Sequence, residues 1–371
     1  MKKLLVITHK RFWIKDNLFY TNGGFLRQME TISKEFTKTT ILCQKVNNNK
    51  TGIHTNFKKI NIIPVKYFFY EKFSRKTNAI VNFPILFFKS IIEIHKNDVL
   101  HVILPGEGFV GLFASLFFNK KVVVRFCTSP KKEIYKMSIP FIKSSLYLLE
   151  KLKNSERYTI YFTGLYDNEV DKKWKDFNWI YSTTLKTNDI PEYRRKQTER
   201  LNLLFIGRLD DNKNVDFSIE VFRELLKKYS DATYTIIGSG PEEKLLIEQN
   251  NDLINSGNLI FKGYLTLEEM EKIKESSSVF IFPSKIEGSP KVIPEVFSFG
   301  IPVVCSTAGN LFWLVQNERG RVINDFDVNL YLNGILEVWK NSEDYLKYSK
   351  NAYNFSKELI LEKWVKKMFD V

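Results

Sequence analysis

The chain is poor in cysteine and in histidine. Its 371 residues include three cysteines and four histidines, and the cysteines stand far apart at Cys43, Cys127 and Cys305. Thiols that are so few and so widely spaced argue against a disulfide framework and against a cysteine-based zinc cluster. A reducing, cytoplasmic compartment therefore fits this composition best.

Long hydrophobic runs are also lacking. The first residues, MKKLLVITHKRFW, contain the apolar run LLVIT, which is typical of a buried strand and too short for a secretory signal. The apolar stretches at 79–94 and 109–118 are interrupted or too short to cross a bilayer. Because 44% of this long chain is apolar, it has enough material for two globular cores.

Negative charge is scarce in one half only. The net charge is +14. Residues 1–190 hold 32 Lys and Arg against 15 Asp and Glu, a balance of +17, whereas residues 191–371 hold 24 against 27, a balance of −3. A cationic excess confined to one half predicts contact with an anionic surface, either lipid or nucleic acid. The alternative is a generally lysine-rich composition, which the acidic second half disfavours.

Strand-like apolar runs alternate with amphipathic stretches, which predicts parallel α/β layers. In the first half the expected strands are KLLVIT, TTILCQ, VLHVIL, KVVVRF and RYTIYFT, with helices around 24–36, 81–95, 108–118 and 136–153. The second half repeats the pattern with strands in LNLLFIGRL, ATYTIIG, NLIFKGYL, SVFIFPS and IPVVCST, and with helices at 215–229 and from 241. The charged stretch 191–200, PEYRRKQTER, marks the boundary between two domains of similar size.

The loops that follow the strands contain the unusual residues, and ligands of parallel sheets bind at this edge. Gly23 and Gly24 precede an expected helix, where backbone amides can approach an anion, although such a pair is commonly only a turn. Arg208 and Lys213 follow the strand LLFIG and could hold phosphate oxygens. Two solvated surface cations are the alternative. Gly238, in the loop GSGP, is explained by a tight turn, because a full dinucleotide fingerprint is lacking.

The stretch FPSKIEGSPKVIPEVFSFGIPVV, residues 282–304, contains two glutamates, Glu287 in an expected loop and Glu295 in the first turn of an expected helix. This helix is expected to begin near 291–294, so the amides around Ser289, Lys291 and Val292 would form an anion site. Carboxylates accept strong hydrogen bonds from sugar hydroxyl groups. The alternatives are a solvated loop residue for Glu287 and a first-turn acid favoured by the helix dipole for Glu295.

Five motifs in order resemble the retaining glycosyltransferases of family 4, which have the GT-B fold. They are GRL-x-x-x-K (207–213), GSGP (238–241), FKGY (261–264), FPS-x-x-EGSPKVIPE (282–295) and GIPVV (300–304). The resemblance covers 200–325, and the first half agrees in its Gly–Gly loop and its order of strands. It implies two Rossmann-like domains that face each other across a cleft, an acceptor domain at 1–192 and a nucleotide-sugar domain at 193–355. The helix of residues 356–371, which contains Trp364, would return to the first domain.

The resemblance also implies roles for individual residues. Arg208 and Lys213 stand where the family holds the donor diphosphate, Glu287 where it contacts the donor sugar beside the reacting carbon, and Glu295 where it holds the ribose. The backbone of residues 288–292 would touch sugar and phosphate, and residues 262–265 would lie near the base. The full set of implied donor-binding residues is Gly23, Gly24, Arg208, Lys213, Gly238, Gly263, Tyr264, Glu287, Gly288, Ser289, Pro290, Lys291, Val292 and Glu295. Such chemistry needs no metal and no cofactor besides the UDP- or GDP-sugar.

The chain departs from the family at two places. The stretch VVVRFCTSP has Cys127 where many members have a histidine, and His101 lies within an expected strand, which predicts core packing. The stretch TAGNLFWLV lacks the glutamate that often follows the late glycines of the family. The sequence Asp325-Phe326-Asp327 has the form of a metal motif of another fold, but its place before an expected helix at 328–339 favours a helix cap.

Two basic segments of the first half could contact a membrane. Residues 65–76 interleave aromatic and cationic side chains, and residues 134–153 could form an amphipathic basic helix. Together with the resemblance, these features lead to the hypothesis of a peripheral enzyme of the inner-membrane surface that extends a lipid-linked glycan of an O-antigen, capsule or lipooligosaccharide. Ordinary core helices with a solvated lysine face are the alternative.

Two other functions remain open from the sequence. The first is a nucleotide-sugar-binding protein or an epimerase of the same fold that transfers no sugar, which the missing histidine allows. The second is nucleic-acid binding, which the basic charge suggests but no recognised nucleic-acid motif supports. Donor turnover without an acceptor would indicate the first, and competition by heparin but not by nucleotides the second.

Overall fold

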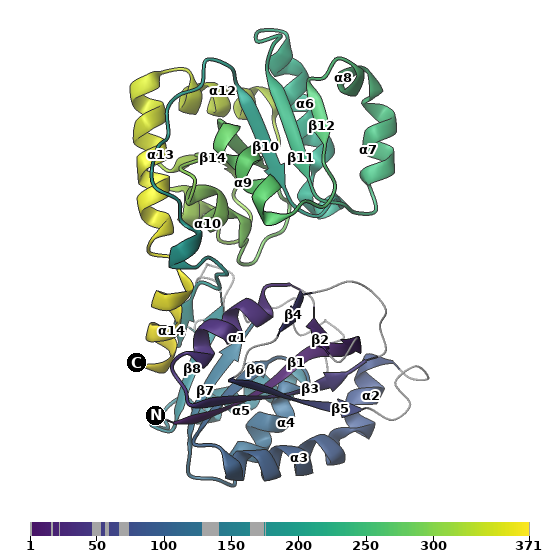
Figure 1. Ribbon diagram of the computed structural model, residues 1–371, viewed down its shortest axis with the longest axis vertical. Coiled ribbons are helices and arrows are strands. Elements are labelled where there is room, and N and C mark those ends of the chain that lie inside the picture. The colour runs from purple at the N-terminus through teal and green to yellow at the C-terminus, as the bar shows by residue number, and fades with distance from the viewer. Residues whose placement is uncertain are drawn as a thin grey trace. The chain divides into compact units, whose positions relative to one another are not determined.

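The computed structural model describes residues 2–15, 18–21, 23–46, 53–55, 59–66, 74–127, 141–163, 174 and 176–370. The chain divides into two compact units, of which unit 1 comprises 1–184 with 361–371 and unit 2 comprises 185–360 (Figure 1). The sequence-based bounds at 192/193 and 355/356 lie within unit 2 by this division.

Unit 1 contains, among the described residues, a nine-stranded sheet. Its parallel strands have the order β5–β3–β1–β6–β7–β8–β9, and β2 and β4 extend β1 in antiparallel fashion. The strands are β1 (Lys3–Lys15), β2 (Leu18–Thr21), β3 (Lys38–Lys45), β4 (Ile53–Thr55), β5 (Ile60–Lys66), β6 (Val99–Leu104), β7 (Lys121–Phe126), β8 (Tyr158–Thr163) and β9 (Asn178–Ile180).

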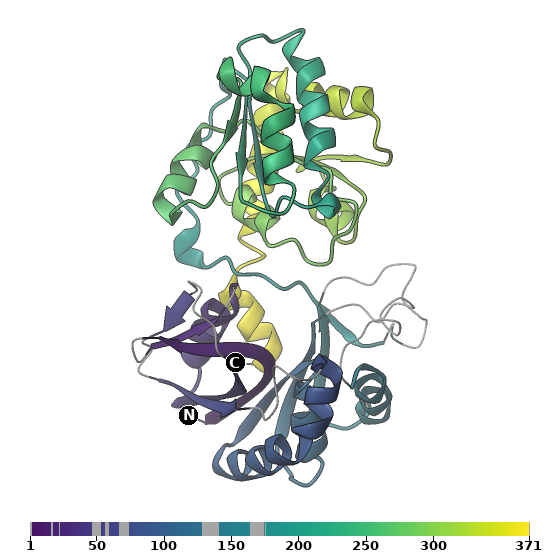
Figure 2. The same ribbon diagram turned by 90° about the vertical axis from the view of Figure 1, so that its right-hand side faces the viewer.

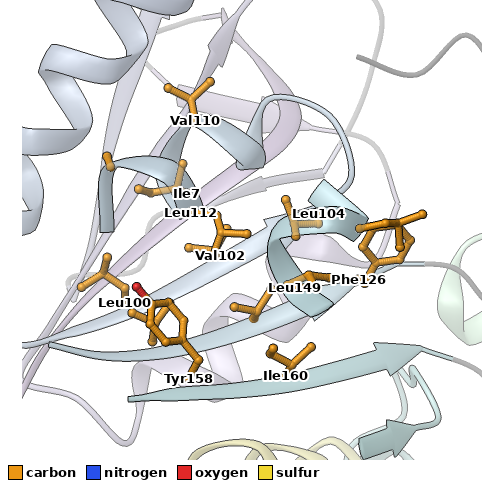
Figure 3. Close-up of a cluster of buried hydrophobic side chains, with 14 of the residues drawn as sticks. Ile7, Leu100, Val102, Leu104, Val110, Leu112, Phe126, Leu149, Tyr158 and Ile160 are labelled. Atoms are coloured by element: carbon orange, nitrogen blue, oxygen red, sulfur yellow. The ribbon is translucent and has the colours of Figure 1, made fainter. Parts of the chain in front are cut away.

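The helices of unit 1 are α1 (Phe25–Ser33), α2 (Arg75–Val81), α3 (Phe83–Lys96), α4 (Gly108–Ser115), α5 (Ile142–Leu152) and α14 (Leu361–Phe369). One hydrophobic core lies between the sheet and the helices α3, α4 and α5 (Figure 3). Close packing of α4 on β1 depends on Gly111, because a Cβ atom there would lie 2.6 Å from the side chain of Ile7. The buried strands read as continuous apolar runs because both faces of the sheet are covered.

The second core of unit 1 contains residues from both ends of the chain. Leu361, Trp364 and Met368 of α14 pack there with Leu4 and Val6 of β1, on the same face of the sheet as α1. The Tyr161 hydroxyl of β8 also donates to the carbonyl oxygen of Lys367, at 2.6 Å. The prediction that the last helix returns to the first domain is therefore confirmed.

Unit 2 contains, in its part of the described chain, a six-stranded parallel sheet in the order β12–β11–β10–β13–β14–β15. The strands are β10 (Asn202–Ile206), β11 (Thr233–Ile237), β12 (Leu259–Phe261), β13 (Val279–Phe282), β14 (Val303–Ser306) and β15 (Gly320–Ile323). The helical segments are η3 (Thr187–Asp189), η4 (Asp211–Lys213), α6 (Val215–Leu226), α7 (Glu243–Gln249), α8 (Asn251–Asn255), α9 (Leu267–Ser276), α10 (Val292–Phe297), α11 (Leu311–Val315), α12 (Val328–Trp339) and α13 (Ser342–Ser356). This is the strand order of a doubly wound fold, which reverses direction between β10 and β13.

Every strand that the sequence predicts overlaps an observed strand, whereas β2, β4, β5, β9 and β15 were missed. The helix expected at 328–339 is α12, and the side chain of its N-cap Asp327 accepts a hydrogen bond from the Leu330 amide. The capping interpretation of residues 325–327 is thus confirmed for Asp327. The basic segments 65–76 and 134–153 fall partly outside the described residues, at 67–73 and 134–140.

Candidate functional site

The candidate site lies where the strand order of unit 2 reverses. Strands β10 and β13 are parallel neighbours, and the chain leaves their carboxyl ends into the loops 207–213 and 283–291. Because successive crossovers diverge to opposite faces at such a point, side chains of these two loops can meet around a ligand. Arg208, Lys213 and Glu287 all lie in these loops.

Lys213 and Glu287 form an ion pair that links the two loops. The Lys213 ammonium bonds to Oε1 of Glu287, and only 21% and 8% of the two side chains are exposed. The ammonium also lies 4.9 Å from the ring centre of Phe282, at the end of β13. Each charge is therefore largely withdrawn from water and stabilised by the other, which makes the pair sensitive to the loss of either partner.

Two further cations of this region are paired with carboxylates. Arg208, with 70% of its side chain exposed, lies 3.3 Å from Asp210. Lys285 of the second loop bonds to Asp211 of the first, at 2.6 Å, and donates its backbone amide to the carbonyl oxygen of Asn212 at 2.8 Å. The first loop thus presents cations and carboxylates together, and an incoming anion would have to displace Asp210 from Arg208.

Acidic neighbours surround these pairs on one side. The pKa of Glu242, at the start of α7, is raised by burial and by the carboxylates of Asp216, Asp211 and Asp210, and the Lys285 ammonium partly offsets this. The electrostatic field beside the loop is therefore mixed in sign. The same carboxylates would repel an anion that made no direct contact with Arg208 or Lys213.

Glycines allow the strand-end loops to approach each other closely. Gly238, with φ of +131°, lies so near the first loop that a Cβ atom there would be 1.9 Å from the carbonyl oxygen of Gly207. Its amide donates to the carbonyl oxygen of Gly263, at 2.9 Å. The loops after β10, β11 and β12 are consequently joined at one edge, where Tyr264 extends into solvent. The contact between loops gives Gly238 a structural reason, which differs from the tight turn that the sequence suggested.

The backbone around Glu287 is supported by a loop that the sequence analysis did not assign to the site. The Asn310 side chain donates to the carbonyl oxygen of Gly288 at 2.7 Å. Gly309, with φ of +55°, lies against Glu287, and a Cβ atom there would be 2.0 Å from the Glu287 carbonyl oxygen. These residues lie in the TAGN stretch, which the sequence analysis noted only for its missing glutamate.

Replacing Gly309 by alanine should displace Glu287 and destabilise unit 2 by roughly 2–4 kcal/mol, because the clash adds to the cost of a left-handed conformation. Gly257→Ala is the matched control, since Gly257 has φ of +77° but nothing within 4 Å of an added Cβ atom. Thermal unfolding of both variants measures the difference. Equal losses in melting temperature would show that the Gly309 contact has no importance of its own.

The remaining predicted residues of unit 2 lie on the chain that continues from Glu287. Gly288 and Ser289 precede the short helix α10, which begins at Val292 and so confirms the expected start. Pro290 is buried, whereas Lys291, Val292 and Glu295 are half-buried. The structure thus brings Arg208, Lys213, Gly238, Gly263, Tyr264 and residues 287–295 to the strand-end side of one sheet. Their roles in binding stay predictions.

Gly23 and Gly24 belong to unit 1 and precede α1, whose N-cap is Gly24. The first turns of this helix contain Gln28, which accepts a hydrogen bond from the buried Arg125 guanidinium at 2.9 Å and donates to the carbonyl oxygen of Thr183 at 2.8 Å. Arg125 also lies 5.2 Å from the ring centre of Trp364. Arg125 and Gln28 therefore join α1 to α14 and to the segment where the chain leaves unit 1.

The two residues noted as departures differ in environment. His101 is fully buried in β6, its Nδ1 lies 3.0 Å from the carbonyl oxygen of Val123, and burial lowers its pKa to about 3. It packs in the core, as predicted. Cys127 is exposed at the end of β7. The pKa of the neighbouring Lys10 is lowered mainly because this lysine is buried, and the charge of Arg125 acts in the same direction.

Among the described residues no cluster of acidic, histidine or cysteine side chains could hold a metal ion, and no helix is long and apolar enough to cross a bilayer.

Comparison with known families gives a match within unit 2. Residues 186–355 match the model of the family "Glycosyl transferases group 1". This range contains every candidate residue of unit 2 named above, so the match supports the glycosyltransferases of GT-B fold as the relatives of this region.

Two curated relatives are also named as glycosyltransferases. An uncharacterized glycosyltransferase of Haemophilus influenzae is 29% identical over 203 residues, which are 50% of this chain and 56% of that protein. The UDP-Gal:alpha-D-GlcNAc-diphosphoundecaprenol alpha-1,3-galactosyltransferase of Escherichia coli is 28% identical over 137 residues, 36% of this chain and 35% of that protein. The alignments thus span about half of the first relative and about a third of the second.

A solved structure resembles the whole chain. It is described as trehalose-6-phosphate from Escherichia coli bound with UDP-2-fluoro glucose, is 12% identical, and has a TM-score of 0.71 over 99% of this chain and 98% of that chain. At this identity the likeness shows the fold alone. The chain has the GT-B fold, with two parallel-sheet α/β domains, and the predicted fold class is confirmed.

Proposed function

We propose that the protein is a retaining glycosyltransferase of family 4 that moves a sugar from a UDP- or GDP-sugar to a glycan acceptor. The observation that carries the proposal is the Lys213–Glu287 ion pair at the reversal point of a doubly wound sheet, with Arg208 in the same loop. A cation beside a carboxylate at this point suits a ligand that combines phosphate groups with hydroxyl groups. The family match over 186–355 supports the same reaction class.

In the proposed reaction the acceptor hydroxyl oxygen bonds to the anomeric carbon on the face from which the nucleoside diphosphate departs. The bond between that carbon and the phosphate oxygen breaks, and the departing phosphate takes the hydroxyl proton, so the anomeric configuration is retained. Arg208 and Lys213 stabilise the charge that develops on the diphosphate, which is why no metal is required. Glu287 binds sugar hydroxyls beside the reacting carbon, and Glu295 binds the ribose.

The backbone of Gly288, Ser289, Pro290, Lys291 and Val292 would line the sugar and the diphosphate, and Gly263 with Tyr264 would adjoin the base. Gly238 would keep the neighbouring loop close, and Gly23 with Gly24 would contribute amides from unit 1. These assignments rest on the resemblance of the motifs, and the positions described for unit 2 are compatible with them.

For the acceptor we propose a lipid-linked glycan of a bacterial surface polysaccharide, handled by a cytoplasmic enzyme at the anionic inner face of the membrane. The cationic balance of residues 1–190 supports an anionic partner for the first half of the chain. The name of the E. coli relative contains a diphosphoundecaprenol acceptor, which is of the same class.

A thermal-shift experiment with UDP, GDP, CMP and several nucleotide-sugars tests the donor site. Stabilisation by one diphosphate in wild type, weakened in Arg208→Ala, is expected because a ligand that binds only the folded state raises the melting temperature by mass action. A ligand present at about 100 times its dissociation constant stabilises by roughly 2.7 kcal/mol. The control Lys244→Ala, at an exposed cation in α7 of unit 2, should respond as wild type does.

Two outcomes would redirect the proposal. Hydrolysis or isomerisation of the donor without any acceptor would favour an epimerase or a related protein of this fold. No shift with any nucleotide, together with a shift by heparin or oligonucleotides, would contradict the donor site and favour nucleic-acid binding.

A further inference from the structure

Helix α3 is apolar on almost every side. Leu86, Ser90 and Ile94 form its buried stripe. Phe83, Ile85, Phe87 and Ile91 flank this stripe and pack against the core while half-buried. The opposite stripe is also apolar, because Phe88 and Ile92 are one turn apart and are 65% and 53% exposed. A helix with apolar residues all round is normally buried, so this outer stripe is unusual for the surface of a soluble domain.

The exposed residues extend onto the neighbouring helices. Ile80 and Val81 end α2 directly before α3, and Phe117 follows α4 with 65% of its surface exposed. The Phe87 ring joins the two sides, with its centre 5.9 Å from that of Phe88 and 6.0 Å from that of Phe117. We call the set Ile80, Val81, Phe88, Ile92 and Phe117 the outer α3 patch. Helices α2, α3 and α4 lie next to one another in unit 1 (Figures 1 and 2).

Three lysines and two acids lie on or beside α3 at this patch, and one of the lysines, Lys120, donates to the carbonyl oxygens of Ile94 and His95 at the end of the helix, at 2.8 and 3.1 Å. Lys89 lies next to Phe88 in the chain, and Lys96 ends α3 with 58% of its side chain exposed. The only acid of α3, Glu93, is 13% exposed and bonds to Lys96 at 2.7 Å. Asp98, just beyond the helix, accepts a hydrogen bond from the Lys3 amide. The patch therefore combines aromatic and aliphatic side chains with cations.

We propose that the outer α3 patch docks unit 1 on the surface of an anionic lipid bilayer. Phenylalanine and isoleucine side chains enter the boundary between headgroups and acyl chains, while nearby lysines are attracted to acidic headgroups. A second copy of the chain fits less well, because a two-fold contact here would bring together two copies of a first half whose charge balance is +17. The inference rests on the proposed function, since a lipid-linked acceptor is presented at such a surface.

The patch differs from the segments that the sequence suggested for membrane contact. Helix α5 covers the described part of 134–153, and its residues Ile142, Leu146 and Leu149 are buried in the core of unit 1. Its apolar face therefore serves internal packing. The outer stripe of α3 presents its apolar residues to solvent instead.

Co-sedimentation of the full chain with vesicles tests the proposal. Wild type should bind vesicles of phosphatidylcholine with phosphatidylglycerol more than vesicles of phosphatidylcholine alone, and the binding should weaken between roughly 50 and 500 mM salt. The double variant Phe88→Ser/Ile92→Ser should lower the partition coefficient about tenfold or more, since it removes two large apolar groups. The control Leu245→Ser, at an exposed leucine of α7 in unit 2, should bind as wild type does.

Other results would overturn the docking surface. Equal vesicle binding by wild type and the double variant, with an unchanged melting temperature, would exclude the outer α3 patch. A dimer in wild type that the double variant abolishes would assign the patch to self-association. If vesicles are not bound while nucleotides still stabilise the protein, the docking surface fails and the glycosyltransferase proposal stands. If vesicles are bound but no nucleotide stabilises the protein, the docking surface stands and only the glycosyltransferase proposal is contradicted.

Discussion

Replacing Glu287 by glutamine should lower the turnover of sugar transfer about 100- to 1000-fold, which is typical for the loss of one charged or hydrogen-bonding group that acts on the transition state. The Glu287 side chain is 8% exposed and lies at the reversal point of the sheet beside Lys213. In the proposed complex its carboxylate accepts hydrogen bonds from sugar hydroxyls beside the carbon that gains positive charge. Glutamine keeps the shape of the side chain but removes the negative charge.

The same substitution should leave the affinity for UDP or GDP unchanged or increase it. The Lys213 ammonium is bound to Glu287 in the structure, so a diphosphate would compete with this carboxylate for the lysine. Removing the carboxylate makes the ammonium available to phosphate. Lys213→Met should have the opposite effect on affinity, weakening diphosphate binding, because it removes the cation itself.

Steady-state kinetics and calorimetric titration of the nucleotide separate the two effects. Glu318→Gln is the matched control, since Glu318 also pairs with a lysine of unit 2, Lys347 at 2.7 Å, but both side chains are exposed. Exposed pairs contribute little to stability, so this variant should behave as wild type does. Normal turnover in Glu287→Gln would remove Glu287 from the reaction, and a large loss of nucleotide affinity would reduce it to a structural partner of Lys213.

The loops of the site were predictable because they follow strands that are apolar throughout. A parallel strand buried on both faces has a distinctive sequence, and its carboxyl end fixes where a ligand can bind. Arg208, Lys213 and Glu287 each follow such a run. Their spacing within recognisable motifs then suggested which residues meet, and the ion pair between Lys213 and Glu287 is compatible with that prediction.

The supporting residues were not predictable, because each acts through a contact with a distant part of the chain. Gly309 and Asn310 lie more than twenty residues after Glu287, and their importance comes from contact with the backbone of residues 287 and 288. The pairing of Asp210 with Arg208 is local, yet nothing in the sequence distinguishes it from a solvated acid. A glycine or an asparagine in a loop has many possible causes, and only the fold selects among them.

The surface of α3 shows a related limit. Its apolar residues recur in every direction around the helix, so periodicity predicts a helix without indicating which faces are covered. The short strands β2, β4 and β9 were missed because they contain only three or four residues each. They are held by pairing with longer neighbours rather than by an apolar pattern of their own.

Replacing Arg195 by methionine should destabilise unit 2 by roughly 2–4 kcal/mol, because a half-buried cation with several hydrogen bonds to backbone carbonyl groups is lost. Arg195 lies in the segment PEYRRKQTER, which the sequence suggested as the boundary between two domains. Its guanidinium donates to the carbonyl oxygens of Lys274, Glu275 and Ser277 at the end of α9, at 2.8–3.2 Å. Its Nε donates to the carbonyl oxygen of Phe299, just beyond α10, at 3.1 Å.

The last carbonyl groups of a helix lack the amide partners that its interior provides, and a cation is favoured at a helix carboxyl terminus. Burial lowers the pKa of Arg195 from its ordinary value.

The neighbour Arg194 is the matched control, because its side chain is 81% exposed and pairs with Glu192. Arg194→Met should therefore change the stability by no more than about 0.5 kcal/mol. For a unit of this size, 1 kcal/mol corresponds to a shift of roughly 2–4 °C, so calorimetric unfolding separates the two variants clearly. Equal melting temperatures of the two variants would mean that this segment only connects the two units. A loss of melting temperature confined to Arg195→Met would show that the segment helps to hold α9 and α10 in place beside the candidate site.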